Sequence, residues 1–173
     1  MLEQMILEEH SKAQKDKIVA WVGTDQKRFD ELVALFLNSE YRVTQRSGWP
    51  LSYIAAGHPK MIKKHLKAII QNMKKPGLHN AVKRNTVRML QYIDIPKSLQ
   101  GEVMNCCFEF IEAPKEAVAV KVFSLTVLYN LSKLYPEILP EIKLIIEARW
   151  AHETAAFRSR ARRIMDNGLM DHR

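Results

Sequence analysis

The sequence predicts an all-α protein of stacked antiparallel helical hairpins, and two observations carry that prediction. Helix-forming residues dominate the chain, which has only 6 glycines among its 173 residues, and no stretch alternates in polarity as a half-buried strand would. One helical pattern also recurs along the chain. Because a lone hairpin of this kind cannot bury its apolar stripe, the repeats must pack against one another.

The repeat is clearest between "VKRNTVRMLQYI", which begins at Val82, and "VKVFSLTVLYNL", which begins at Val120. Further copies begin at Val43 and at Phe157, so that successive copies are 39, 38 and 37 residues apart. The retained positions run i, i+4, i+7, i+8 and i+11, which is one stripe of an α-helix. A small residue at i+4 of every copy predicts close approach between helices: Ser47, Thr86, Ser124 and Ala161.

A second helix is predicted after each of the first three copies. Each of these segments opens with a proline, which is tolerated in the first turn of a helix because its missing N–H has no partner there. Pro59, Pro96 and Pro136 therefore mark helix starts. Two more helices are predicted at the front, across "SKAQKDKIVAWV" and "DQKRFDELVALFL", and the latter looks like a shortened leading repeat.

The first copy of the repeat, "QRSGWPLSYIAAG", contains Gly48 and Pro50. A proline inside a helix costs about 3 kcal/mol, yet Pro50 stands where Met89 stands in the next copy. We therefore predict a bent helix in which Pro50 fills a core position. Trp49 falls in a column that is polar in the other copies, so we expect it either to pack against the leading repeat or to lie exposed beside Arg46.

The near-equal spacing, the paired helices and the proline at the start of each second helix resemble the HEAT and armadillo superfamily of α-solenoids. The resemblance covers roughly residues 11–165. It implies a right-handed superhelix of stacked hairpins, with a single domain over residues 1–165 and a short C-terminal tail over residues 166–173. A four-helix bundle is the competing fold, but it would not explain three near-equal offsets.

The charge of the chain is concentrated in one segment. The formal net charge is +8, and residues 41–93 hold eleven Lys or Arg and no Asp or Glu. A solvated polar face is the plain alternative, but such a face normally mixes charges of both signs. The resemblance would place the lysines of the second helix inside the concave groove. The residues predicted to bind a polyanion or an acidic partner are Lys60, Lys63, Lys64, Lys67, Lys74, Lys75, Lys83, Arg84 and Arg88.

A secondary binding edge is predicted on the first copy of the repeat. Arg42, Arg46, Trp49 and Tyr53 follow one another at i, i+4, i+7 and i+11, so they share a helical face. Basic side chains interleaved with aromatic rings suit base stacking or cation–π contacts. The alternative is that Trp49 packs inside the molecule.

No catalytic or metal motif stands out. The six histidines lack zinc spacing, there is no Gly-rich phosphate loop, no G-x-S-x-G and no CxxC, and the adjacent Cys106 and Cys107 fit a buried helix. No apolar run is long enough for a membrane span. We therefore expect a non-enzymatic cytoplasmic scaffold without metal or cofactor, whose partner is a protein, a nucleic acid or both, and which does not enter a membrane.

Two alternative functions stay open. One is a protein–protein adaptor in which the basic segment has no role. The other is a DNA alkylation-repair glycosylase, because small enzymes of that kind are built on HEAT-like repeats with basic grooves. Such an enzyme uses an acidic residue in its groove, and the nearest candidates here, Asp94 and Glu102, lie at the far edge of the basic segment.

Overall fold

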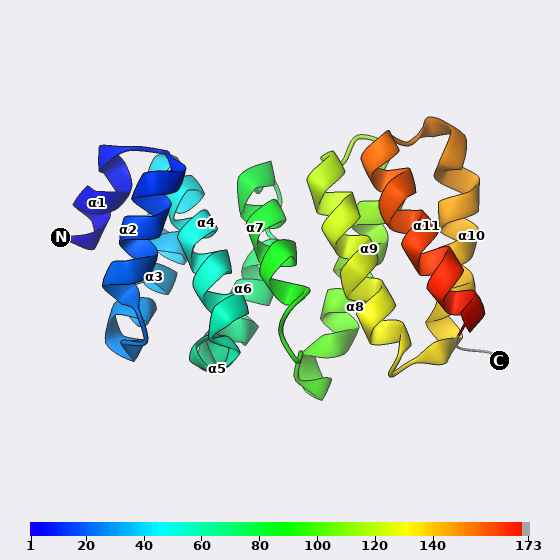
Figure 1. The fold of residues 1–173 in the computed structure, drawn as a ribbon, viewed down its shortest axis with the longest axis horizontal. Coiled ribbons are helices and arrows are strands. Elements are labelled where there is room, and N and C mark those ends of the chain that lie inside the picture. The colour runs from blue at the N-terminus through cyan, green and yellow to red at the C-terminus, as the bar shows by residue number, and fades with distance from the viewer. Residues whose placement is uncertain (171–173) are drawn as a thin grey trace. The chain divides into compact units, whose positions relative to one another are not determined.

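The computed structural model describes the backbone of residues 1–170 and the side chains of residues 1–166, and within that range it is helical and contains no strand. This confirms the all-α prediction. The chain divides into two compact units, unit 1 over Met1–Ile95 and unit 2 over Pro96–Arg173. Each unit is a set of packed helices joined by short connections (Figure 1).

Unit 1 is organised around α4, against which α1, α2, α3 and α7 all pack. Its two predicted front helices, α2 and α3, are present and begin at side-chain caps: Ser11 Oγ accepts from the N–H of Gln14 at 3.1 Å, and Asp25 Oδ1 accepts from the N–H of Lys27 at 2.9 Å. The elements are α1 Leu2–Glu8, α2 Lys12–Val22, α3 Gln26–Asn38, α4 Tyr41–Gly57, α5 Pro59–Ile62, η1 Lys63–His65, α6 Leu66–Met73 and α7 Asn80–Leu90.

The short helix α1 precedes the region in which the sequence indicated helices. Leu2 and Ile6 lie one turn apart on it and are fully buried. Their i, i+4 spacing is the signal that could have found the helix. The helical array therefore begins about ten residues earlier than the resemblance indicated.

The helix α4 is continuous through the Gly-Trp-Pro sequence. Pro50 is buried within it, as predicted for a core position. Gly48 faces the neighbouring helix α7, where a Cβ added to Gly48 would lie 2.7 Å from Nδ2 of Asn85. The glycine therefore lets α4 and α7 approach each other at this point.

Unit 2 is organised around α9, against which α8, α10 and α11 pack. The predicted starts of the second helices are confirmed in both units, because α5 begins at Pro59, Pro96 is the N-cap of α8 and η2 begins at Pro136. The elements are α8 Lys97–Glu112, α9 Val118–Ser132, η2 Pro136–Ile138, α10 Leu139–Arg149, η3 Trp150–His152 and α11 Ala155–Met170.

The small residues of the repeat lie in the core. All four are 0% exposed: Ser47, Thr86, Ser124 and Ala161. The repeated small position is therefore an internal one in every copy. At the C-terminus, α11 extends to Met170, well into the segment expected to be a tail, and residues 171–173 lie outside the described range.

Candidate functional site

The lysines of α5, η1 and α6 form an exposed face, which we call the α5–α6 lysine face: Lys60, Lys63, Lys64 and Lys67. The opposite side of the same segment is fully buried and consists of Ile62, Leu66, Ile69 and Ile70. The segment therefore has a basic side and an apolar side. Apolar burial fixes the segment against unit 1 and directs the lysines to solvent.

One carboxylate reaches this lysine face from a different helix. Asp30 of α3 lies 2.5 Å from Nζ of Lys64 and 2.6 Å from Nε2 of His65, and its Oδ1 accepts from Nε2 of Gln26 at 2.8 Å. Burial raises the pKa of Asp30, but the hydrogen bonds from Lys64, Gln26 and His65 outweigh it and hold that pKa well below its ordinary value. The lysine face is therefore less free of acid than the sequence of residues 41–93 suggested, because Asp30 lies outside that segment.

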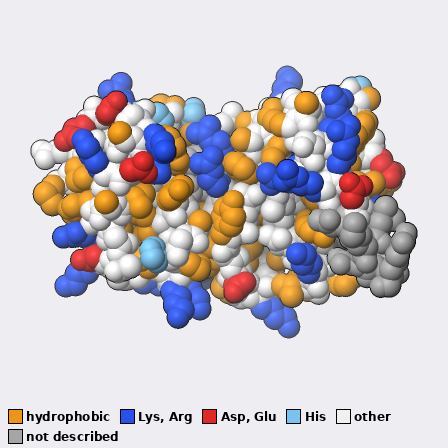
Figure 2. All heavy atoms as spheres, in the orientation of Figure 1, with side chains coloured by type: hydrophobic (Ala, Val, Ile, Leu, Met, Phe, Trp, Pro, Cys, Tyr) orange, Lys and Arg blue, Asp and Glu red, His pale blue; other side chains and the backbone are white. Residues whose placement is uncertain are grey.

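A second basic group, which we call the α6–α7 basic edge, extends from the end of α6 along α7: Lys74, Lys75, Lys83, Arg84 and Arg88. Lys74, Lys75 and Arg84 are exposed, whereas Lys83 and Arg88 are half-buried. Burial, together with the charge of Arg84 one turn earlier, lowers the pKa of Arg88. Figure 2 shows Lys and Arg side chains gathered over the upper part of α7.

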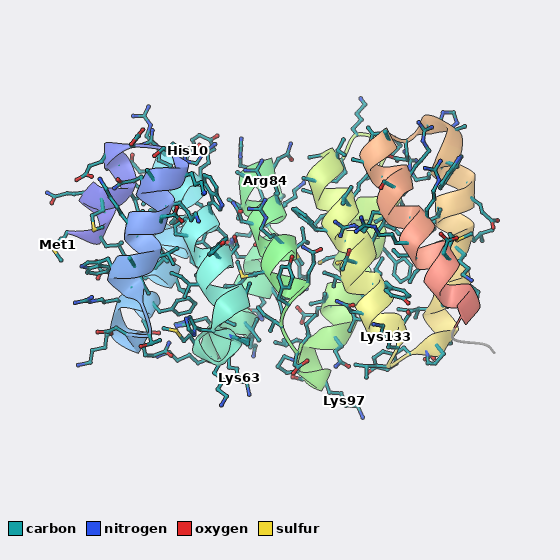
Figure 3. The ribbon with its side chains drawn as sticks, viewed as in Figure 1. Met1, His10, Lys63, Arg84, Lys97 and Lys133 are labelled. Carbon is teal, nitrogen blue, oxygen red and sulfur yellow. The ribbon has the colours of Figure 1, made fainter. Side chains whose placement is uncertain are left out.

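The two basic groups do not form one row. Figure 3 places Lys63 at the lower end of unit 1 and Arg84 near the upper end. Lys63 and Arg84, one from each basic group, therefore lie toward opposite ends of unit 1. Sequence spacing could not show this, because the chain reverses direction between α6 and α7.

The start of α7 is tied to the start of α4 beside the basic edge. Nδ1 of His79 accepts from the N–H of Ala81 at 3.1 Å, and Nε2 of the same ring lies 3.0 Å from the hydroxyl of Tyr41. Because Nδ1 is an acceptor, the ring proton lies on Nε2 and is donated to Tyr41. This contact orders the connection that carries the basic edge.

The predicted secondary edge on α4 is largely occupied by the chain itself. The guanidinium of Arg46 donates to the backbone oxygen of Leu7 at 2.8 Å and so holds the end of α1. Trp49 is half-buried, and its ring lies 6.1 Å from that of His10. Trp49 is therefore partly covered, and its ring contacts are with His10 and Lys15, which precede α3, the predicted leading repeat.

A buried lysine completes this contact. Lys15 of α2 is only 5% exposed, and its ammonium lies 3.8 Å from the ring centroid of Tyr53 and 5.7 Å from that of Trp49. It also forms an ion pair with Asp16. Tyr53 nevertheless remains 58% exposed and Arg42 is exposed, so these two members of the edge stay open to solvent.

The basic position that recurs in the repeats is buried in unit 2. Lys121 occupies the place of Lys83 in the next copy, but it is 2% exposed and its ammonium lies 2.6 Å from Oε1 of Glu153. The same oxygen accepts from Nε of Arg149 at 2.7 Å. Lys121 is therefore an internal residue that binds the connection between η3 and α11.

The described part of the chain contains neither a cluster of metal ligands nor a membrane-spanning helix. No group of three or more His, Cys, Asp or Glu side chains there could hold a metal ion. No helix in the same part is long and apolar enough to cross a membrane. Cys106 and Cys107 are buried, and burial raises the pKa of the Cys107 thiol to about 12, so the thiol stays protonated.

The fold belongs to the class of helical-repeat proteins, in which successive helical hairpins bury the same stripe of apolar positions. A family model described as the HEAT repeat domain matches residues 2–167, and the chain belongs to that family. Comparison with curated proteins and with solved structures gave no match.

Proposed function

We propose that the protein is a non-enzymatic HEAT-repeat scaffold that binds an acidic protein partner through the α6–α7 basic edge of unit 1. The observation that carries the proposal is the gathering of like charges around one helix connection. Arg84 and Arg88 lie one turn apart on α7, and the proximity of Arg84 contributes to the lowered pKa of Arg88. Like charges at this spacing cost stability, and an acidic partner would relieve that repulsion.

The family supports a protein as the partner, because HEAT repeats generally mediate protein interactions. The α6–α7 edge is chosen because Arg84 contributes there to the lowered pKa of Arg88, whereas on the α5–α6 lysine face Asp30 pairs with Lys64. Electrostatic complementarity of this kind chiefly accelerates association and selects the partner. A partner carrying several exposed carboxylates fits these requirements.

A charge-reversal series tests the proposal. The variant combines Lys74→Glu, Lys75→Glu and Arg84→Glu, three exposed positions of the edge. The probe is fluorescein-labelled poly-L-glutamate, and binding is followed by fluorescence anisotropy at low salt. We expect the affinity to fall by about tenfold or more, since each exposed ion pair contributes about 0.2–1 kcal/mol.

A matched control separates this surface from general charge effects. Lys12→Glu, Lys17→Glu and Lys27→Glu reverse the same number of exposed lysines on α2 and α3 of the same unit. The control should retain most of the affinity. Equal losses in the two variants, or no binding by the wild-type protein, would reject the basic edge as the site.

The absence of an enzymatic activity is part of the same proposal. Of the two candidates for the acidic residue of a glycosylase, Asp94 is exposed in unit 1 and Glu102 is half-buried on α8 of unit 2. We expect no release of alkylated bases when the protein is incubated with methylated duplex DNA. Base release above the level of a buffer control would replace the scaffold proposal with the enzymatic one.

Two exposed tyrosines favour single-stranded nucleic acid as a second candidate partner. Tyr53 lies on α4 and Tyr92 in the turn that follows α7; they occupy the same position of successive repeats and are 58% and 61% exposed. Arg88 precedes Tyr92 by four positions, so a cation and an aromatic ring are neighbours in this part of the chain. Stacking of a base on such a ring is worth about 1–3 kcal/mol.

The test uses a fluorescein-labelled single-stranded DNA and replaces both tyrosines. Tyr53→Ala with Tyr92→Ala should lower the affinity by about tenfold, whereas Tyr53→Phe with Tyr92→Phe keeps both rings and should retain it. If the two pairs of substitutions have the same effect, base stacking is excluded.

A further inference from the structure

A cavity in unit 2 is lined by none of the basic residues discussed so far. It has a volume of about 640 Å³ and opens at the turn between α9 and α10. This volume lies within the range of about 300–1,000 Å³ that is typical of small-molecule sites. Its lining consists of Tyr129, Ser132, Lys133, Pro136, Leu139, Pro140 and Lys143.

The wall of the cavity is mostly apolar. Tyr129 comes from α9, Pro136 from η2, and Leu139 and Pro140 from the first turn of α10. The one hydroxyl of serine in the lining is already used, because Ser132 Oγ donates to the backbone oxygen of Tyr129 at 2.7 Å. An apolar group is therefore the chemistry that this wall would take.

Helix α10 also has more apolar surface than its packing requires. Ile142, Ile145 and Ile146 are buried on one side, whereas Leu144 is 65% exposed beside the cavity residue Lys143. Leu134, next to Lys133, is 62% exposed. Leu134 and Leu144 are thus exposed apolar neighbours, in sequence, of two residues that line the cavity.

Two lysines give the cavity its charge. The ammonium of Lys133 lies 5.0 Å from the ring centroid of Tyr129, and Lys143 contributes a half-buried side chain from α10. The carboxylates closest in sequence, Glu137 and Glu141, are exposed and do not belong to the lining. An apolar wall with two cations complements a ligand that has an apolar body and an anionic head.

We propose that this cavity binds a small amphiphilic anion, with its apolar body against Leu139 and the two prolines and its anionic head between Lys133 and Lys143. A carboxylate and a phosphate would both serve as the head, because lysine recognises either as a point charge. This site is independent of the proposed acidic partner of unit 1, so either proposal can fail without the other.

Isothermal titration calorimetry with decanoate, decyl phosphate and decanol, each below the concentration at which it aggregates, tests the assignment. We expect decanoate or decyl phosphate to bind saturably at one site per chain, and the preferred head group to identify the natural anion. Uncharged decanol should bind at least about tenfold more weakly, because it lacks the ion pairs with the lysines.

Two variants with equal charge changes complete the experiment. Lys133→Glu with Lys143→Glu should reduce the affinity for the anions by about tenfold or more, whereas Lys97→Glu with Lys115→Glu, two exposed lysines of unit 2 outside the lining, should change it less than about twofold. Circular dichroism verifies that both variants are folded. No saturable binding by the wild type, equal binding of decanol, or equal losses in both variants would overturn the proposal.

Discussion

Replacing Gly48 by alanine should destabilise the protein, although the same change normally strengthens a helix. Gly48 lies inside α4, where a Cβ would be 2.7 Å from Nδ2 of Asn85 and 3.2 Å from both its Cβ and its Cγ. Asn85 is 2% exposed and cannot swing outward freely, because its Nδ2 donates to the backbone oxygen of Ala81 at 2.9 Å. The new methyl group therefore meets a side chain that is held in place.

The net effect is the difference between two opposing contributions. Alanine in place of glycine within a helix gains about 0.5–1 kcal/mol. Forcing an extra methyl group into a packed interface costs about 1–3 kcal/mol. We therefore expect Gly48→Ala to lower the free energy of unfolding by up to about 2.5 kcal/mol.

The effect of Gly48→Ala on the free energy of unfolding should change sign when the side chain of residue Asn85 is shortened. In an Asn85→Ala background the amide is gone but the contact at 3.2 Å with Cβ remains, so Gly48→Ala should be nearly neutral. In an Asn85→Gly background that contact is also gone, and Gly48→Ala should stabilise by about 0.5–1 kcal/mol. Urea unfolding followed by circular dichroism measures each pair, and an equal effect of Gly48→Ala in all three backgrounds would refute the proposed clash.

Three further predictions concern buried and paired groups. Asp30→Asn should lower the melting temperature at neutral pH, and the difference in melting temperature from the wild type should shrink as the pH falls below about 4. The reason is that a carboxyl group with a lowered pKa in the folded state contributes its whole stabilisation above its unfolded-state pKa and loses it on acidification. A difference that persists at acidic pH would contradict this. In a Cys106→Ser variant at mildly alkaline pH, Cys107 should react with Ellman's reagent much more slowly in the folded protein than in guanidinium chloride. Burial raises the pKa of the Cys107 thiol to about 12 in the folded protein. Equal reaction rates would show that the thiol is accessible. Glu153→Ala should lower the free energy of unfolding, measured by chemical denaturation, by about 3–5 kcal/mol, because it leaves Lys121 buried without its carboxylate partner. Lys121→Met should lower it less. The opposite order would show that the ion pair is not the source of the stability.

The elements of the fold could be predicted because they depend on local spacing. Apolar residues at helical intervals, the small residue in each copy and the prolines at the starts of second helices are all visible within short windows of sequence. Pro50 could be placed in the core because a later copy has Met89 at that position. Helix α1 was missed because its buried stripe consists of little more than Leu2 and Ile6.

The pairing of charges could not be predicted, because it depends on contacts between distant segments. Lys64 meets Asp30 from 34 positions earlier, and Lys121 meets Glu153 from 32 positions later. Alignment of the repeats places Lys121 and Lys83 at the same position, but Lys121 is buried in an ion pair, whereas Lys83 is half-buried in the α6–α7 basic edge. The cavity at the α9–α10 turn likewise depends on how two helices diverge, which no spacing rule describes.

The salt dependence of binding tests the central claim, that the α6–α7 basic edge of unit 1 receives an acidic partner. The measurement is the affinity for labelled poly-L-glutamate at increasing salt, for the wild type and for the Lys74→Glu, Lys75→Glu, Arg84→Glu variant. We expect a steep decline for the wild type and a weaker, flatter response for the variant, because salt screens exposed charges. Superimposable curves for the two proteins would contradict the account.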